Sequence, residues 1–390
     1  MQIMQNSLLF DGIAIQGTLK TPFHGGSEYA KYILREALIA GYTFDVVFRN
    51  DLIIDDEIIS LLSTYSKCKI YYVNRLKDVS ELIRRNNYKV FYSALPYKYG
   101  NVNFYDAVFI QVIHGLRKIE LPWDFYKYKY KKNLMKILAR IVSSNIFIQN
   151  ILKKKHLRKI NAIIQKPNSI IYTVSSHSKH SLLYFFPGLE YQNIKVFYSP
   201  FGSSVNKFKG NSLIEGDYYL MVNANRFEKN IYRAIKSFDK LISDGHLKDK
   251  KIVITGCNNL GFFKEIRNFE KFNLFPYVST DEIESLYSNA FAFVYPSLNE
   301  GFGYPPLKAM GYGVPVIASC ATSIPEVCSN AALYFNPLSM DELTNRILQI
   351  EYDKTIRSFL IDKGLIRFQE LIDKQKTELP IMLRQIFGNV

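Results

Sequence analysis

Short runs of apolar residues alternate with longer amphipathic stretches along almost the whole chain. Twelve of the apolar runs have the length of β-strands. The stretches between them, such as residues 232–243 and 281–289, have apolar positions at helical spacing. Regular alternation of this kind predicts parallel sheets covered by helices, so we expect an α/β protein. The expected strands are residues 7–15, 44–48, 69–73, 89–95, 107–115, 170–176, 194–200, 218–223, 251–256, 290–297, 315–320 and 331–336.

The alternation is interrupted near the middle of the chain. Residues 199–217, SPFGSSVNKFKGNSLIEGD, are rich in Gly, Ser and Asn and have no periodicity, which is typical of a linker. A series of strands lies on each side, and 390 residues suffice for two domains. In doubly wound sheets ligands bind beyond the carboxyl ends of the strands. Two facing sheets would therefore hold one ligand in the cleft between them.

Composition is that of a folded chain in a reducing compartment. Hydrophobic residues make up 48% and charged residues 22%, so burial can offset the entropy of folding. The four cysteines, at 68, 257, 320 and 328, show neither CxxC pairs nor a dense framework, which argues against disulfides and zinc. The amino-terminal residues 1–16 have no basic residue before their apolar run, so they predict a first strand and not a secretory signal.

Most of the net charge of +15 lies in one segment, residues 117–166. It has 14 Lys or Arg against Glu120 and Asp124, a local charge of +12. Aromatic residues at 123–130 are interleaved with lysines, and apolar residues at helical spacing follow. This composition is typical of helices that lie on an anionic membrane surface. The candidate membrane-facing residues are Lys131, Lys132, Lys153, Lys154 and Lys155.

Two other interpretations of the basic segment stay open. The lysines could face only water on a long solvated helix, or they could bind nucleic acid, because lysine stripes alone do not choose between anionic partners. The aromatic residues favour the membrane, and no stacking motif or known nucleic-acid module is present. The uncharged stretch 141–152 has 12 residues, short of the roughly 20 needed to cross a bilayer.

Two candidate ligand contacts follow apolar runs in the first half. Gly25 and Gly26 precede a helical pattern, so backbone amides at a helix start could approach a phosphate. A Gly-Gly pair before a helix is more often only a turn. His114 directly follows the apolar residues of the expected strand 107–115, where it could hydrogen-bond a sugar hydroxyl or carry a proton. A lone histidine is more often a structural residue.

Two further candidates follow strands in the second half. In NRFEKN, residues 225–230, Arg226 and Lys229 precede a helix. Cations at a helix start oppose the helix dipole, which favours an anion between them, and a guanidinium with an ammonium suits a diphosphate. In LNEGFGYPPLKAMG, residues 298–311, prolines begin a short helix and Glu300 lies in the loop before it. An ionised carboxylate only accepts hydrogen bonds, which suits sugar hydroxyls and not phosphate.

These residues resemble glycosyltransferase family 4. The resemblance is carried by PSLNEGFGYPPLKAMGYGVPVIAS, by PEV at 325–327, by AALYFNP at 331–337 and by NRFEKN, which is similar to the family's Arg-x-x-Lys-Asn site. The Gly25-Gly26 loop and His114 match the amino-terminal signatures. The family implies the GT-B fold, two facing Rossmann-like doubly wound parallel-sheet domains with an interdomain cleft. We expect domains at 1–200, with the basic membrane-facing helices at about 117–166, and at 201–365, and terminal helices at 366–390 that pack back on the first domain.

The resemblance also implies an activity and its residues. Family members transfer a sugar from a nucleoside diphosphate to an acceptor, with retention of configuration and without a metal or other cofactor. Arg226 and Lys229 would neutralise the departing diphosphate, Glu300 would hold donor-sugar hydroxyls, and His114 would touch the sugar near the reacting carbon. The residues expected to bind the donor are Gly25, Gly26, Asn230, Val278, Gly301, Phe302, Gly303, Tyr304 and Lys308.

The sequence departs from the family at Lys308. The family has a glutamate eight positions after the first, where it contacts ribose hydroxyls, and a lysine can donate to a hydroxyl but not accept from it. Lys308 could contact the nucleotide differently, the donor could be unusual, or the chain could be non-catalytic. We favour altered contact because Glu300, Arg226 and Lys229 are retained.

The expected function is therefore a hexosyltransferase of bacterial surface polysaccharide synthesis. Its expected partners are a nucleotide sugar, a lipid-linked saccharide acceptor and an anionic membrane surface, with no nucleic acid. The expected location is the cytoplasm, peripherally on the inner face of the membrane. The alternative is a non-catalytic GT-B subunit that binds or stabilises a partner transferase.

Overall fold

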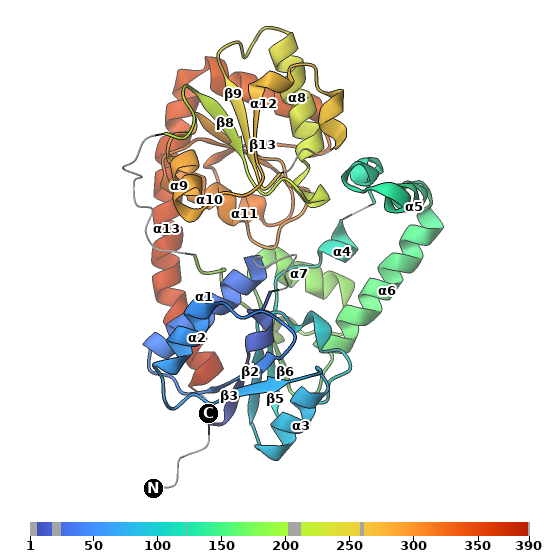
Figure 1. Ribbon diagram of the computed structural model, residues 1–390, viewed down its shortest axis with the longest axis vertical. Coiled ribbons are helices and arrows are strands. Elements are labelled where there is room, and N and C mark those ends of the chain that lie inside the picture. The colour runs from blue at the N-terminus through green and yellow to red at the C-terminus, as the bar shows by residue number, and fades with distance from the viewer. Residues whose placement is uncertain (1–5, 18–24, 122, 202–211, 258–260, 389–390) are drawn as a thin grey trace. The chain divides into compact units, whose positions relative to one another are not determined.

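The computed structural model describes residues 6–17, 25–121, 123–201, 212–257 and 261–388 (Figure 1). The chain forms two compact units. The first consists of Met1–Leu116, Lys154–Pro200 and Lys374–Val390, and the second of Arg117–Lys153 and Phe201–Asp373. Of the expected linker 199–217, residues 202–211 lie outside the described part of the chain.

The first unit is built on a seven-stranded parallel sheet with the order β3-β2-β1-β4-β5-β6-β7. β1 and β4 are buried along their whole length, which explains their uninterrupted apolar runs, since strands covered on both faces need no polar alternation. Phe10 pairs in register with Val46 on one side and Tyr92 on the other. The strands are β1 Leu8–Asp11, β2 Asp45–Arg49, β3 Ile70–Val73, β4 Val90–Ser93, β5 Val108–Ile113, β6 Ser169–Thr173 and β7 Ile194–Val196.

Helices cover this sheet with apolar faces. α1 buries Tyr29, Ile33 and Leu34, which recur at helical spacing. The α-helices that lie wholly in the first unit are α1 Gly25–Ile39, α2 Asp56–Ser63, α3 Asp78–Arg85 and α7 Ser176–Phe185. Its 3-10 helices are η1 Gly12–Ala14, η2 Pro96–Lys98 and η4 Tyr191–Asn193.

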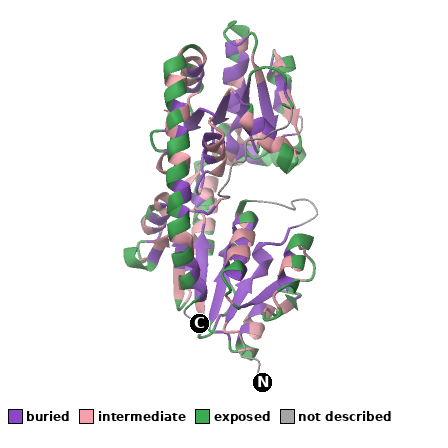
Figure 2. Ribbon diagram, turned by 90° about the vertical axis from the view of Figure 1, so that its left-hand side faces the viewer, coloured by how far each residue is buried: buried purple, intermediate pink, exposed green. Residues whose placement is uncertain are grey.

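The second unit has a six-stranded parallel sheet with the order β10-β9-β8-β11-β12-β13. Figure 2 shows most of the strand ribbon of this sheet in the buried colour. Eleven of the twelve expected runs have a strand of four or more residues, and the twelfth, 194–200, has the three-residue β7. The sequence pattern missed β10, a short edge strand that is only partly buried. The strands are β8 Tyr218–Met221, β9 Lys251–Thr255, β10 Phe272–Phe275, β11 Ala292–Tyr295, β12 Val316–Ser319 and β13 Ala332–Phe335.

The helices of the second unit include three that follow expected patterns closely. α8 and α9 coincide with the amphipathic stretches, and α10 begins one residue before its two prolines. The α-helices are α4 Arg117–Glu120, α5 Asn133–Ser144, α8 Ile231–Ser243, α9 Thr280–Ser288, α10 Tyr304–Gly311, α11 Ile324–Cys328 and α12 Met340–Tyr352. The 3-10 helices are η3 Phe125–Tyr130, η5 Phe227–Lys229, η6 Gly261–Glu265 and η7 Phe269–Lys271.

Two helices run from one unit into the other. α6 Ile146–Ile164 changes unit between Lys153 and Lys154, and α13 Lys354–Phe387 changes unit between Asp373 and Lys374. The terminal residues therefore form one helix that starts at 354, where we expected separate helices from 366. The sequence has no helix stop in this region, apart from Pro380 inside α13.

The expected assignment of the basic segment to domain 1–200 is wrong for Arg117–Lys153, which belongs to the second unit. The physical reason is the packing of its aromatic residues. Tyr126 and Tyr130 pack against the buried core of the second unit, and Tyr130 contacts the ring of Phe262 at 5.1 Å between centroids. The Tyr130 hydroxyl also accepts a 2.9 Å hydrogen bond from the backbone N–H of Tyr232.

Both sheets have the strand order of a doubly wound nucleotide-binding fold, so the expected fold class is confirmed. In such sheets the strand order reverses between the first and fourth strands, and ligands bind beyond the carboxyl ends there. The reversal lies between β1 and β4 in the first unit and between β8 and β11 in the second. Ion pairs among Arg117, Arg226, Glu228, Lys229 and Glu300 lie at the second of these positions.

Candidate functional site

The carboxyl ends of β8 and β11 bring two predicted residues into direct contact. Lys229 lies in η5 after β8, and Glu300 lies in the loop after β11. The Lys229 Nζ donates to Glu300 Oε1 at 2.6 Å and to the Tyr295 hydroxyl at 3.3 Å. Their side chains are 5% and 10% exposed. The structure thus brings these two predicted residues together as a buried ion pair.

The Glu300 carboxylate is ionised at neutral pH. Burial by itself would raise the pKa of the Glu300 carboxyl, but the charges of Lys229 and Arg117 outweigh it and lower that pKa to about 2. Burial lowers the pKa of the Lys229 ammonium, while Glu300 opposes the change. Glu300 is therefore an anion with acceptor lone pairs at physiological pH, as hydrogen bonding to sugar hydroxyls requires.

The turn that carries Lys229 is shaped by Asn230. This residue has a left-handed conformation, with φ of 56°, and its Nδ2 donates to the carbonyls of Pro296 and Pro337 at 3.0 and 2.7 Å. Its Oδ1 accepts from Arg233, and its backbone N–H donates to Phe227. These bonds make Asn230 a positioning residue for the turn. A direct contact of Asn230 with a donor stays a prediction.

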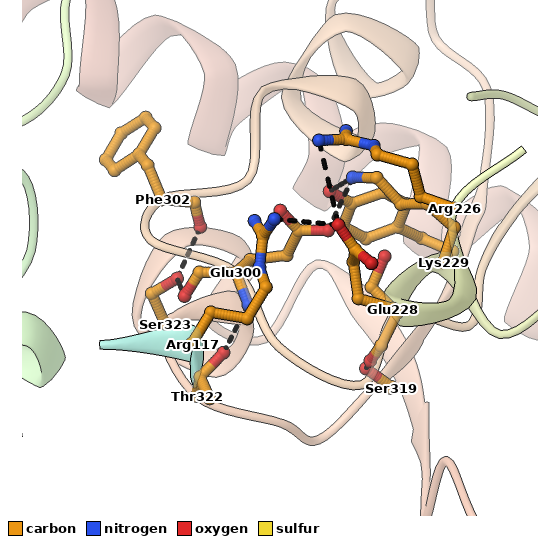
Figure 3. Close-up of polar contacts among 11 residues, drawn as sticks. Arg117, Arg226, Glu228, Lys229, Glu300, Phe302, Ser319, Thr322 and Ser323 are labelled. Carbon is orange, nitrogen blue, oxygen red and sulfur yellow. Dashed lines mark hydrogen bonds and ion pairs between the residues drawn. The ribbon is translucent and has the colours of Figure 1, made fainter. Parts of the chain in front are cut away.

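The Glu300 loop is held by two hydroxyl side chains that follow β12. The backbone N–H of Glu300 donates to Thr322 Oγ1 at 2.9 Å, and Ser323 Oγ donates to the carbonyls of Glu300 and Phe302 at 3.1 and 2.7 Å (Figure 3). Gly303 has φ of 129°, which side chains rarely adopt, and it precedes α10 directly. The Glu300 loop is therefore rigid at its base and reaches a helix start.

Two charged residues near Lys229 and Glu300 were not predicted from the sequence, namely Arg117 and Glu228. Arg117 Nη1 donates to Glu228 Oε1 at 2.8 Å, and Arg226 Nη1 lies 3.8 Å from the same oxygen (Figure 3). Arg117 lies in α4, 111 residues before its partner. Glu228 is the fourth letter of NRFEKN, so its position in the motif was the only available signal. Together with Lys229 and Glu300, these five side chains have a net charge of +1.

Lys308 in α10 has a carboxylate beside it. Its Nζ lies 4.0 Å from Glu284 Oε1 of α9, and both side chains are about one-third exposed, at 35% and 31%. Burial lowers the pKa of Lys308, and the charge of Glu284 opposes the change. Val278, also predicted to contact the donor, is half-buried in the loop before α9. Position 308 therefore holds a cation with a carboxylate next to it, where the family has a glutamate.

The amino-terminal candidates lie in the first unit. His114 Nε2 is 3.0 Å from the carbonyl of Ala94, and because a carbonyl only accepts, Nε2 carries the proton. Its ring packs edge-on against Tyr29 at 4.8 Å. A Cβ on Gly26 would lie 2.6 Å from a methyl of Leu95, so packing alone explains this glycine, whereas Gly25 is exposed with open space around it. Their contact with a donor stays a prediction.

The basic segment divides into a docked part and an exposed part. Besides its tyrosines, the docked part is held by Arg233, whose Nη2 donates to Asp124 at 2.5 Å, and by an ion pair of Lys129 with Glu265. The interleaved aromatic residues that favoured a membrane therefore contact protein in part. The five candidate membrane-facing lysines are all exposed.

The exposed part presents an apolar stripe. Leu134, Ile137, Leu138 and Ile141 recur at helical spacing on α5 and are 45–66% exposed, while Ala139 faces the protein. Ile146, Phe147 and Ile151 continue the apolar surface on α6. A merely solvated helix would turn its lysines outward and its apolar residues inward. Within the described residues no helix is both long and apolar enough to cross a membrane.

Metal-ligating side chains do not cluster in the part of the chain that the structure describes. The described residues contain no cluster of three His, Cys, Asp or Glu side chains that could hold a metal ion. Three cationic side chains, those of Arg117, Arg226 and Lys229, lie close to Glu228 or Glu300.

Comparison with known proteins agrees with this geometry. Residues 204–365 match the family described as glycosyl transferases group 1. These residues lie in the second unit, so its longer stretch resembles a group 1 glycosyltransferase domain. The expected family resemblance is therefore confirmed for this part of the chain.

Individual proteins are also similar to this chain, either in sequence or in fold. The chain is 32% identical over 245 residues to the O-antigen chain mannosyltransferase RfbU of Salmonella typhimurium, covering 61% of this chain and 60% of RfbU. It thus spans less than two thirds of that relative. Its fold is similar to that of a sucrose-phosphate synthase from Thermosynechococcus elongatus, with a TM-score of 0.69, 14% identity and coverage of 99% and 100%. Anabaena HepE in complex with UDP-glucose gives a TM-score of 0.66, 14% identity and coverage of 98% and 99%.

Proposed function

We propose that the protein transfers a mannosyl group from a nucleoside diphosphate mannose to a saccharide of a bacterial surface polysaccharide. The observation that carries this proposal is the buried Lys229–Glu300 ion pair, with Arg226 beside it, at the strand-order reversal of a glycosyltransferase domain. The choice of mannose and of O-antigen rests on the name of RfbU.

The proposed reaction needs positioning and charge neutralisation. The bond between the anomeric carbon and the diphosphate oxygen breaks, and its electron pair leaves with the diphosphate. An acceptor hydroxyl forms the new glycosidic bond with retention of configuration, and its proton passes to the diphosphate. Arg226 and Lys229 stabilise the charge that develops on the leaving group. Glu300 accepts from sugar hydroxyls and so fixes the anomeric carbon. No metal or other cofactor is needed.

The acceptor is proposed to be lipid-linked because of the α5 stripe. An apolar row flanked by exposed lysines fits the interface of an anionic membrane, where apolar side chains enter the acyl boundary and lysines meet lipid headgroups. A peripheral position on the inner membrane face would bring the second unit to a lipid-linked saccharide. The exposed apolar row argues against a merely solvated helix, since a solvated face does not expose such a row.

The first test is transfer of mannose from a panel of nucleoside diphosphate mannoses, with wild type beside Lys308→Glu. We propose that Glu284 accepts from nucleotide hydroxyls while Lys308 donates to them. Lys308→Glu then places two carboxylates together, and we expect the KM for the donor to rise about 10-fold with little change in kcat. The charge-swapped double variant Glu284→Lys with Lys308→Glu is the matched control and should recover most of the affinity.

One result of this assay would favour the non-catalytic alternative. If wild type neither binds nor transfers from any donor and Lys308→Glu restores transfer, the chain lost its activity at position 308 and serves as a supporting subunit. An inactive wild type that Lys308→Glu does not restore would likewise contradict the proposed transfer.

Membrane binding is tested by co-sedimentation with vesicles. Neutralising Lys153, Lys154 and Lys155 to Ala should weaken binding to anionic vesicles on the order of 100-fold, since each lysine near such a surface contributes about 1 kcal/mol. Changing Leu134, Leu138 and Ile141 to Ser should abolish it. The control neutralises three exposed lysines outside the segment, Lys67, Lys248 and Lys264. Equal binding by all variants, or to neutral vesicles, contradicts the membrane proposal.

A further inference from the structure

Arg117 stands next to the predicted donor residues although no motif includes it. It begins α4, three residues after His114, and belongs to the second unit with Arg226, Lys229 and Glu300. Its charge is close enough to lower the pKa of both Glu300 and Lys229. Figure 3 shows its guanidinium among these side chains. The group therefore contains a third cation.

The guanidinium of Arg117 is incompletely satisfied. Nη1 donates to Glu228, but the buried Nε has no hydrogen-bond partner. A buried donor without an acceptor costs about 1–3 kcal/mol, so native proteins leave few of them. Among the described residues six buried side-chain polar atoms lack a partner, and only Arg117 and Arg357 contribute a charged group. An arriving anion would satisfy Nε.

Glu228 holds both arginines through one oxygen. Oε1 lies 2.8 Å from Arg117 and 3.8 Å from Arg226, and the Glu228 side chain is 17% exposed. A carboxylate between two guanidinium groups occupies the place that a diphosphate oxygen would take, because guanidinium forks match carboxylate and phosphate alike. Glu228 is therefore an internal counterion that competes with an anionic ligand.

Backbone and side-chain bonds fix Arg117 relative to the Glu300 loop. Glu120 of the same short helix accepts from Asn299 Nδ2 at 2.7 Å. The carbonyl of Glu228 accepts from the backbone N–H of Leu298 at 2.8 Å. α4, the NRFEKN turn and the Glu300 loop are thus tied to one another, so Arg117 needs no large movement to meet a ligand there.

We propose that Arg117 is a third diphosphate-binding residue, which Glu228 holds until the diphosphate displaces it. The proposal rests on the proposed function, since it assumes that the ligand is a nucleoside diphosphate. When the diphosphate binds, the guanidinium groups of Arg117 and Arg226 release the Glu228 carboxylate and donate to phosphate oxygens. The net charge of +1 on the five side chains is opposite in sign to the charge of the ligand. No covalent step is involved.

Calorimetric titration of the full chain with GDP, UDP, ADP and inorganic pyrophosphate tests the proposal. Arg117→Ala should reduce the affinity for the tightest-binding of these ligands about 10- to 100-fold, as expected for the loss of a charge-assisted hydrogen bond. The dependence of that affinity on salt concentration should also become weaker. Affinity for the corresponding nucleoside should not change. Arg117→Lys should recover part of the loss. Lys118→Ala, which removes one exposed charge from the next position, is the matched control and should bind like wild type.

Glu228→Gln separates this role from a purely structural ion pair. It removes the competing charge and keeps Arg117, so diphosphate binding should tighten several-fold, and the double variant with Arg117→Ala should lose that gain. A structural pair predicts weaker binding in Glu228→Gln instead. Unchanged affinity in Arg117→Ala, or weaker binding in Glu228→Gln, overturns the proposal for Arg117 alone. Failure of wild type to bind any of the four ligands overturns the proposed function as well.

Discussion

Replacing Lys229 by Met is expected to reduce transfer about 10³-fold and to destabilise the second unit by about 3–5 kcal/mol. Transfer falls because a preorganised charge beside the leaving group is lost. Stability falls because the Glu300 carboxylate, 10% exposed, is left buried without its cation. Transfer rates and chemical denaturation, followed by the unfolding of the second unit, measure the two effects.

The double variant Lys229→Met with Glu300→Gln distinguishes the two effects. It contains no unpaired buried charge, so most of the stability should return, while transfer should stay low because neither charge is available. Lys240→Met removes a lysine that is 60% exposed at the end of α8, and it should change neither quantity by much. Near-normal transfer in Lys229→Met would contradict the catalytic assignment, and full recovery of transfer in the double variant would contradict it too.

Asp124→Ala is expected to cost about 3 kcal/mol and to release the basic segment from the second unit. Asp124 and Arg233 form an ion pair whose side chains are 9% and 11% exposed, so removal of one partner leaves a buried charge. Arg233 also donates to Asn230 Oδ1, and we therefore expect weaker nucleoside diphosphate binding as a second effect. Chemical denaturation and calorimetry measure these changes.

Limited trypsin digestion provides an independent readout for the same variant. Lysines 127, 129 and 131 should be cleaved faster in Asp124→Ala, since the docked part of the segment opens more often. Asp124→Asn keeps an oxygen that can accept from the backbone N–H of Tyr126 and should lose less stability. Lys240→Met, at an exposed position outside the segment, is the control. Wild-type cleavage rates in Asp124→Ala would show that the ion pair does not hold the segment.

The sheets could be predicted because buried parallel strands are continuous apolar runs. β1 and β4 are covered on both faces, so their composition alone marks them. β10 was not predicted because FNLF is an edge strand with partly exposed residues. Its pattern is too short to distinguish from a loop. The proximity of Lys229 and Glu300 was predictable for a related reason, since both follow strands that meet at the strand-order reversal.

The partners within the site could not be predicted in the same way. Lys229 was expected to face a diphosphate, yet its ammonium also pairs with Glu300, and nothing local in the sequence couples positions 71 residues apart. Arg117 and Glu228 are separated further still. The aromatic residues of the basic segment gave a misleading signal, because composition does not distinguish a tyrosine that docks on protein from one at a lipid interface.

The assignment of Arg117–Lys153 to the second unit affects how such proteins can recombine. A chimera joined at residue 200 would inherit Asp124, Tyr126 and Tyr130 from one parent and their partners, including Arg233 and Phe262, from the other. Gene exchange that keeps these contacts must therefore carry two separate stretches of coding sequence together. The coding sequence of the second unit is therefore discontinuous. Experiments that exchange this unit between related proteins should place junctions on both sides of residues 117–153.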